Sequence, residues 1–249
     1  MTQQLDNIFW YSLSGAQACF AAGKGNARRY AKGFSPILGF ADAQNPDFSL
    51  LENDCEPDEH FYVGGWTGTV PNGWHVTAES SMYRMVWDGV MPAEDDTFQA
   101  RRLLPADAEQ AVALARLANP GPFGLRTIEL GEYLACFVVE NSGEHSGNLS
   151  GNHASERLIA MAGERSFAPP YREVSGVCTH PDFQGQGLAK RLMHKIIRRQ
   201  LLANEIPFLH VMSSNTAAHE LYLRMGFRDY CETPVRVVSR VHSNSVATQ

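Results

Sequence analysis

The stretch from Val174 to Ala189 constrains the fold more than any other part of the sequence. It reads V-S-G-V-C-T-H-P-D-F-Q-G-Q-G-L-A, an apolar run of β-forming residues that breaks at His180-Pro181-Asp182 and passes through two glycines into an amphipathic helix. The pattern predicts a strand, a glycine loop and a helix. Glycines let a backbone approach a ligand closely, and the unpaired N–H groups of a helix's first turn favour a bound anion, typically phosphate. A plain strand-to-helix turn is the alternative.

Spacing excludes two commoner phosphate-binding motifs. A dinucleotide fingerprint needs a third small residue three positions after the second glycine, where this chain has the bulky, charged Lys190. A Walker A loop needs Gly-Lys-Ser/Thr after a longer glycine loop, and the segment Gly23-Lys24-Gly25-Asn26 lacks both parts. Neither nucleotide-binding motif therefore explains the loop.

The loop matches the pattern Gln/Arg-x-x-Gly-x-Gly/Ala, and here the sequence resembles the GNAT superfamily of acyl-CoA-dependent N-acetyltransferases. A second block of that family follows at Asn215 to Phe227, with the pattern Asn…Ala…Leu-Tyr…Gly-Phe. Two ordered blocks are much more specific than one, and the resemblance covers about residues 97 to 240. In that family the loop holds the pyrophosphate of coenzyme A, which here assigns cofactor binding to Gln184, Gly185, Gln186, Gly187, Leu188 and Ala189.

The resemblance implies an α/β fold of the mixed α+β kind, the GNAT-like acyl-CoA N-acyltransferase fold with splayed parallel central strands. The strand at Val174 and the buried strand Phe208 to Met212 are the expected parallel pair, since a helical crossover separates them. In that family the pantetheine arm of acetyl-CoA enters the gap between them. The backbones of Val177 and Thr179, with Cys178 between them, would bind the arm as an added strand.

Acetyl transfer needs a neutral amine and a proton for the departing thiolate. The family places a tyrosine beside the sulfur, which makes Tyr222 the expected acid, with a core tyrosine as the alternative. Alkylamines, with a pKa near ~10.4, are mostly protonated at neutral pH, so a base is useful. Glu173 is the candidate base, acting directly or through water. An ordinary ion pair of Glu173 with Arg172 or Arg165 is the alternative.

Two further groups complete the expected site. Asn215 would hold the pantetheine or phosphate region through its amide, and it also suits a helix N-cap. The backbone N–H of Val177 would polarise the thioester carbonyl, as an oxyanion-hole donor does. The helix after the loop carries cations that either meet the 3′-phosphate of coenzyme A or form a solvated face: Lys190, Arg191, Lys195, Arg198 and Arg199.

Two alternatives differ in mechanism or class. Cys178 with His180 would allow an acyl-enzyme, but strand alternation puts Cys178 on the opposite sheet face from Val177, and a buried cysteine is usually inert. A non-catalytic protein that binds or senses acyl-CoA on the same fold is the second alternative. The presence of Tyr222 argues against it, because a pure binder needs no acid at the sulfur.

Charge and composition exclude several classes of partner. A net charge of −6 and a pI near 5.8 disfavour nucleic acid, whose binders are basic. No basic leader and no apolar run of the ~20 residues that a membrane span needs are present, which predicts a cytoplasmic protein. The five scattered cysteines contain no C-x-x-C pair, so reduced thiols and no metal site are expected.

The first part of the chain, residues 1–96, is expected to form a smaller mixed α/β unit before the acetyltransferase domain at residues 97–249. The pattern suggests a short helix at Ile8 to Ala21, followed by separate strands at Phe61 to Val63, Trp74 to Thr77 and Met82 to Trp87. The acidic stretch Asp88 to Asp96 is the expected boundary. The unit supplies aromatic and acidic residues that suit a cationic amine, so we expect it to contribute to the acceptor side, with a purely stabilising unit as the alternative.

From residue 97 the order of predicted elements follows the family. A strand is expected at Phe98 to Leu104, then a helix with a capping box of Asp107 and Gln110 and with Val112, Leu114 and Leu117 on its apolar face. A second helix is expected at 123–130 and a hairpin of 133–140 with 157–164. The polar connection 141–155 and the tail 243–249 are expected to be flexible or disordered. The acceptor is a small-molecule or peptide amine, and a homodimer is compatible with the sequence.

Overall fold

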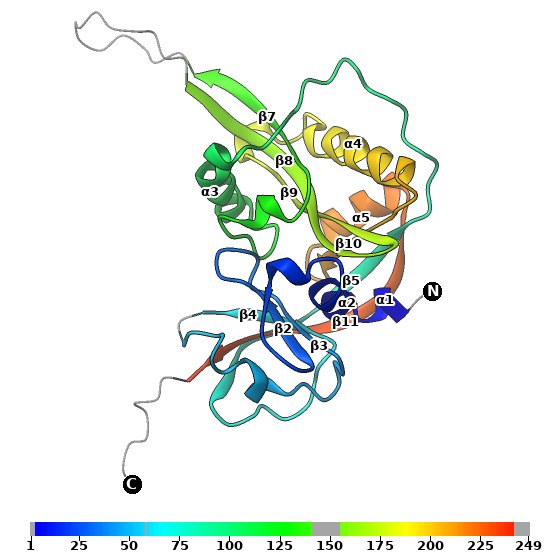
Figure 1. The fold of residues 1–249 in the computed structure, drawn as a ribbon. Coiled ribbons are helices and arrows are strands. Elements are labelled where there is room, and N and C mark those ends of the chain that lie inside the picture. Colours follow the sequence, from blue (N-terminus) through cyan, green and yellow to red (C-terminus); the bar gives the residue numbers. More distant parts are fainter. Residues whose placement is uncertain (1–2, 58, 141–154, 242–249) are drawn as a thin grey trace, which may run out of the picture.

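The computed structural model describes residues 3–57, 59–140 and 155–241. In this part of the chain, one mixed sheet of eight strands dominates the molecule, and a small antiparallel sheet of three strands lies beside it (Figure 1). The small sheet has the order β1 (Ala21–Ala22), β2 (Ala27–Tyr30), β3 (Leu38–Phe40). The large sheet has the order β4 (Phe61–Gly64), β11 (Phe227–Arg240), β5 (Trp74–Trp87), β10 (Ile206–Met212), β9 (Tyr171–Thr179), β8 (Ser155–Ala168), β7 (Tyr133–Glu140), β6 (Arg101–Arg102).

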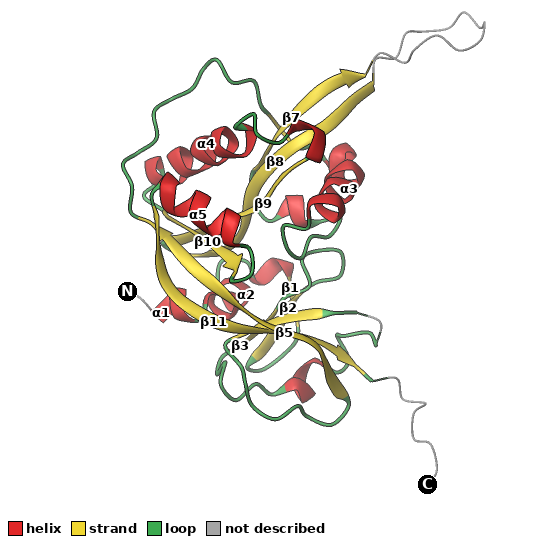
Figure 2. Cartoon of the chain, turned by 180° about the vertical axis from the view of Figure 1, so that it is seen from behind, coloured by secondary structure: helices red, strands yellow, loops and turns green. Residues whose placement is uncertain are grey.

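Helices cover both faces of the large sheet (Figures 1 and 2). One face carries α4 (Leu188–Leu202) and α5 (Thr216–Met225), and the other carries α1 (Gln3–Asp6), α2 (Ile8–Ser14) and α3 (Ala108–Ala118). None of the helices in the described ranges is both long and apolar enough to cross a membrane.

Each face of the sheet buries its own apolar cluster. On β5, Met85 belongs to the cluster of α4 and α5, whereas its neighbour Val86 belongs to the cluster of α2. Leu209 and Phe208 on β10 divide between the two clusters in the same way. This division follows from the period of two along a strand, which sends successive side chains to opposite faces. The central strands are covered on both sides, and the polar residues that they carry, such as Glu173 and His210, have partners inside the structure.

The region before residue 97 does not form a sheet of its own beyond β1 to β3. Both β4 and β5 belong to the large sheet, and β5 lies between β10 and β11, antiparallel to each. β5 also runs unbroken through Trp74 to Thr77 and Met82 to Trp87, which the sequence suggested were separate strands. Removing the first 96 residues would therefore take a central strand out of the sheet.

Most of the expected elements after residue 97 are present. The antiparallel pairing of β7 with β8 confirms the predicted hairpin, and β9, α4, β10 and α5 follow in the predicted order. The predicted helix is α3, with Val112 and Leu114 buried, but Leu117 is exposed. Residues 141–154 and the tail 243–249 lie outside the described residues.

Local details of this region differ from the sequence-based expectations. The expected strand at 98–104 is reduced to Arg101–Arg102, and the segment 123–130 contains a single 3-10 turn at Thr127–Glu129. The capping box is also wrong. The Asp107 carboxylate accepts hydrogen bonds from Arg101 and from the N–H of Leu104, while Gln110 accepts one from Leu158 of β8. Asp107 and Gln110 thus bind residues outside the first turn of α3 and do not form the reciprocal hydrogen bonds at the helix start that their spacing suggested.

Candidate active site

The two central parallel strands pair only at their beginnings. The register joins Tyr171 with Ile206 and Glu173 with Phe208, and no later pairing of β9 with β10 occurs in the described residues. Beyond this point β9 continues beside β8 as far as Thr179, and β10 continues beside β5 as far as Met212. The expected splay is therefore present (Figure 2). We call the space between residues 174–179 and 209–212 the gap.

A β-bulge lies at the border of the gap. On β8 and β9 the register changes between Met161↔Cys178 and Gly163↔Ser175, so β9 carries one extra residue there. Gly176 has a φ of 62°, and a Cβ on it would lie 2.8 Å from the ring of Tyr133, so glycine is required. The bulge changes the direction of the backbone at Val177, the expected oxyanion donor. A glycine inside an apolar strand is a sequence signal for such a bulge, and the site prediction did not use it.

The glycine loop opens directly into α4, as predicted. Gly185 and Gly187 have φ values of 76° and 73°, and no atom lies within 4 Å of a Cβ built on either. Gly187 is the N-cap residue and provides no side-chain cap. Among the described residues, no acceptor contacts the backbone N–H groups from Gly185 to Lys190. The loop is exposed and has the open space and the free donors that an anion site needs.

Most of the cations on α4 are already occupied. Arg191 forms an ion pair with Asp95 and lies over the ring of Phe98, and Lys195 donates to the backbone of Asp95. Arg198 binds Glu94 and the backbone of Pro92. These three cations hold the connecting segment 88–96 against the helix, so they are not free for phosphate. Arg199 binds Glu132 and Glu164, whereas Lys190, exposed in the first turn, has neither an ion pair nor a side-chain hydrogen bond among the described residues.

Tyr222 of α5 lies close to the gap. Its ring packs edge-on against Phe227, and it belongs to the same cluster of side chains as Val177. Burial and, to a lesser extent, the Cys178 thiol raise the pKa of Tyr222 to about 12. The shared cluster brings the Tyr222 ring, from the helix after β10, together with a side chain of β9. At neutral pH the hydroxyl keeps its proton, as an acid must.

Asn215 and Cys178 have defined local roles. The Asn215 side chain accepts a hydrogen bond from the N–H of Ala218 at 3.2 Å, so it is the N-cap of α5. Cys178 packs with Met161 and Tyr133 in the α3 cluster, on the face opposite Val177. Burial raises the pKa of the Cys178 thiol to about 12, so it stays protonated and weakly nucleophilic. This environment argues against an acyl-enzyme on Cys178.

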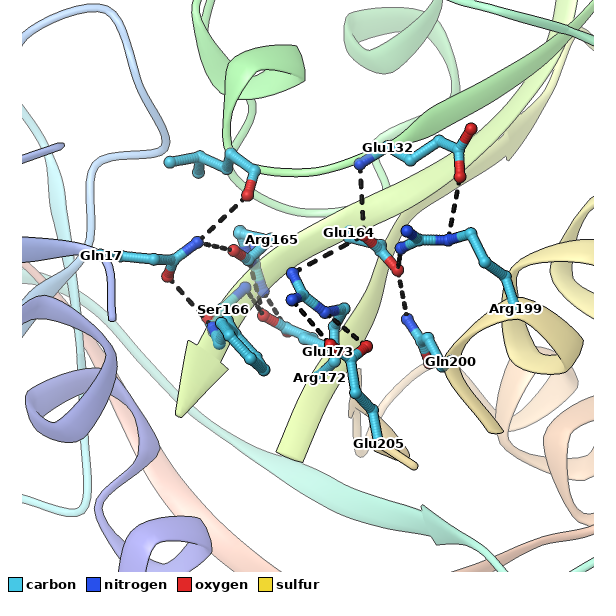
Figure 3. Close-up of polar contacts among 12 residues, drawn as sticks. Gln17, Glu132, Glu164, Arg165, Ser166, Arg172, Glu173, Arg199, Gln200 and Glu205 are labelled. Carbon is cyan, nitrogen blue, oxygen red and sulfur yellow. Dashed lines mark hydrogen bonds and ion pairs between the residues drawn. The ribbon is translucent and has the colours of Figure 1, made fainter. Parts of the chain in front are cut away.

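Glu173 belongs to a buried ionic network at the last paired position of β9 (Figure 3). Its carboxylate binds Arg165 at 2.6 and 3.1 Å, the N–H of Ser166 at 3.1 Å and His210 at 2.8 Å. Burial alone would raise the pKa of Glu173, but Arg165 and His210 hold it well below its ordinary range. A carboxylate with these four contacts is a weak base. The geometry favours the ion-pair interpretation of Glu173, with Arg165 as its partner; Arg172 binds Glu205 instead.

His210 and Arg84 extend this network and were not identified from the sequence. Arg84 of β5 donates from Nε to Nε2 of His210 at 3.1 Å, so Nδ1 of the ring carries the proton and donates to Glu173. Burial lowers the pKa of His210, which keeps the ring neutral. No motif marks these two residues, because sheet pairing between distant segments brings them together. The described residues contain no cluster of His, Cys, Asp and Glu suited to a metal ion.

Comparisons with known proteins agree with this geometry. The model of the acetyltransferase (GNAT) family matches residues 106–227. A solved structure from Novosphingobium aromaticivorans DSM 12444, described as an acetyltransferase from the GNAT family, is 30% identical with a TM-score of 0.80, over 96% of this chain and 99% of that one. The GCN5-related N-acetyltransferase from Kribbella flavida is 13% identical with a TM-score of 0.53, over 97% and 94% of the two chains, and shows the fold alone. No curated protein matches the chain.

Proposed function

The chain belongs to the GNAT family of acetyltransferases, and on this premise we propose that it moves an acetyl group from acetyl-CoA to a primary amine by direct attack in a ternary complex. One observation carries the proposal. The open glycine loop, with its free N–H groups, follows the end of β9. The edge of β9 that faces the gap, from residue 174 onward, has no strand partner among the described residues. A site suited to phosphate thus lies next to a strand edge suited to an extended chain. Coenzyme A has a matching part for each, a pyrophosphate and an extended pantetheine arm.

The residues that border the gap suit the two ends of the cofactor. The N–H groups of Gly185 to Lys190 would hold the pyrophosphate, and the Lys190 ammonium lies in the same turn. The unpaired edge of residues 177–179 would bind the pantetheine arm as a strand partner does. Bound there, acetyl-CoA supplies an activated acetyl group as a thioester. The remaining amide of Asn215, whose Oδ1 caps α5, is available to the same arm.

Two groups of the chain would act on the acetyl group. The backbone N–H of Val177, redirected by the bulge at Gly176, would donate to the carbonyl oxygen as negative charge develops on it. The Tyr222 hydroxyl would donate its proton to the departing thiolate, and its raised pKa of about 12 keeps that proton in place until then. The proton that the attacking amine loses on forming the amide would return the phenolate to its neutral form. Glu173 would position the side chains of Arg165 and His210 and would not accept a proton, because its oxygens already bind these two residues.

An activity screen tests this proposal against the alternative of an acyl-CoA sensor. Purified protein would be mixed with acetyl-CoA and with amines of each class: amino acids, polyamines, aminoglycosides, and peptides with a free N-terminus or lysine. Thiol release and the mass of the product would be measured. We expect one class to accelerate thiol release at least ~10-fold over background and to gain one acetyl group. Binding of acetyl-CoA without acceleration by any amine would instead support the sensor.

A further inference from the structure

A pocket of about 360 Å³ lies under the N-terminal helices, outside the cofactor residues assigned above. Its walls come from the junction of α1 with α2, from the end of β4 and from the segment 231–234 of β11, and Arg84 of β5 lines it. The volume falls in the range of pockets that hold small molecules, roughly 300–1,000 Å³. The pocket therefore has the size of a ligand site and contains one deeply buried cation.

Arg84 differs from the other deeply buried arginines of the described chain. Its residue is 3% exposed, yet no carboxylate in the described ranges forms an ion pair with it. Its partners are Nε2 of His210 at 3.1 Å, the backbone oxygen of Asp6 at 3.3 Å and a long contact to the Cys231 thiol. By contrast, Arg29 binds Glu59 at 2.6 Å and Arg165 binds Glu173 at 2.6 Å.

A buried guanidinium without a counter-charge costs free energy, and buried charges in folded proteins are normally paired. Burial lowers the pKa of Arg84, but an arginine keeps its proton in a protein. The carboxylates of Glu173 and Asp6 attract Arg84 without touching it, and a ligand in the pocket that Arg84 lines would supply the direct ion pair. A guanidinium binds a carboxylate through two parallel hydrogen bonds, which gives both strength and orientation.

The pocket adjoins the gap through β10. Arg84 binds His210, which lies in the part of β10 that borders the gap. Glu232, also in the pocket wall, accepts a hydrogen bond from the Ser81 hydroxyl, and the backbone oxygen of Ser81 accepts one from Ser213, the residue after β10. Two contacts thus connect the pocket with the strand along which the acetyl group would lie.

We propose that this pocket holds the acceptor and that Arg84 binds its carboxylate, so that the acceptor is a free amino acid. The inference rests on the proposed function, because it identifies the substrate of that same reaction. The charges of the pocket match a zwitterion. Arg84 meets the carboxylate, and the acidic residues of the wall, Asp6 and Glu232, stabilise the cationic amine before it loses its proton.

Matched substrates test the proposal directly. The twenty amino acids and their carboxamides would be compared as acceptors, since each pair differs only in the carboxylate. We expect wild-type kcat/KM for the best amino acid to exceed that for its amide by on the order of 100-fold, because a charged, bidentate contact is lost. In Arg84→Met this ratio should fall to near one, and Arg84→Lys should keep part of it. Arg172→Met, which removes an ion-paired arginine outside the pocket, should leave the ratio unchanged.

Folding and binding measurements keep the outcomes apart. Arg84→Met should remain folded and melt close to wild type, because it removes a buried charge that has no direct ion pair. Calorimetry with the same amino acid, in the presence of coenzyme A, should show binding to wild type and its loss in Arg84→Met. If amides react as well as amino acids, the proposed function stands and the carboxylate assignment is overturned. If no amine reacts, the proposed function fails, and absence of amino-acid binding would then overturn the role of Arg84 as well.

Discussion

The paired and the parted halves of β9 and β10 differ in how completely their polar groups are satisfied. Where the strands pair, Glu173 binds His210 and Arg165. The nearby Glu164 binds Arg199 and Gln200, as Figure 3 shows. Where they part, the edge of residues 174–179 has no strand partner among the described residues, apart from a side-chain contact of Gln184 with the Thr179 carbonyl, and the N–H groups of the glycine loop have no acceptor there.

This difference distinguishes polar groups that stabilise the fold from polar groups that are available to a ligand. A buried polar group without a partner costs roughly 1–3 kcal/mol. Polar groups that only stabilise the fold are therefore expected to have hydrogen-bond partners within the chain. Donors that remain free, in the open and next to each other, then indicate a binding site. The same reasoning assigns Arg165 to structure and Arg84 to a ligand, although both are buried.

The largest effect is expected at the loop. Gly187→Glu should abolish measurable binding of coenzyme A in calorimetry, because the new side chain occupies the open space above the loop and adds a negative charge where phosphate binds. Gly73→Glu is a matched control. Gly73 has a φ of 80° and open space around its Cβ, so it has a similar backbone strain and gains the same charge away from the gap. Wild-type affinity in a folded Gly187→Glu protein would place the cofactor elsewhere.

A change in the paired half should affect stability. Glu173→Gln leaves the buried Arg165 without a counter-charge and should lower the free energy of unfolding by about 3 kcal/mol or more. Glu205→Gln breaks the half-buried pair with Arg172 and should cost about 1 kcal/mol. Chemical denaturation of both variants measures these values. A Glu173→Gln protein that is as stable as wild type but has lost turnover would return Glu173 to the role of base.

The pH dependence of stability adds a second readout for Glu173. The folded-state pKa of Glu173 is lowered, so its contribution is complete above the ordinary Glu value of ~4.3 and is lost as the pH falls below it. The pKa of His210 is lowered too, so its contribution is lost as the pH falls below ~6.5. Wild-type stability should therefore decrease with acidification, and below pH ~4.3 the Glu173→Gln curve should be flatter.

A change at Tyr222 should lower turnover without a loss of cofactor binding. Tyr222→Phe should lower kcat by roughly 10- to 1,000-fold, or about 1.4–4 kcal/mol, and leave the affinity for coenzyme A nearly unchanged. Tyr133→Phe provides a matched loss of a phenol, because the buried Tyr133 hydroxyl has no partner in the described structure. Its turnover should equal that of wild type. Steady-state kinetics of the Tyr222→Phe and Tyr133→Phe variants test this. Equal kcat values for the two variants would show that Tyr222 has no part in the mechanism.

The parts of the fold that depend on local pattern could be predicted from the sequence. The strand, loop and helix at 171–202, the hairpin of β7 with β8 and the block at 215–227 all carry their own signals of periodicity, glycine spacing and turn residues. The parallel pairing and the splay of β9 and β10 followed from the crossover and from the resemblance to the GNAT family. These signals lie within short windows of the chain.

The rest depends on contacts between distant segments. The sequence does not show that β5 enters the sheet between β10 and β11, because any amphipathic strand could pair at several positions. The pairing of Arg84 with His210 and the occupation of the α4 cations by the segment 88–96 follow from that arrangement. Short elements such as β6 were also mispredicted, since tertiary contacts outweigh propensity over a few residues.

Hydrogen–deuterium exchange with and without coenzyme A tests most directly whether the cofactor binds where β9 and β10 separate. We predict that saturating coenzyme A slows exchange of the backbone amides of residues 185–190 and of those in residues 174–179 that face the gap and not β8, because the cofactor would supply their partners. Exchange in residues 171–173 and 206–208, already paired, should change little. Slowed exchange confined to the paired residues or to the N-terminal helices, with the loop unchanged, would contradict the account.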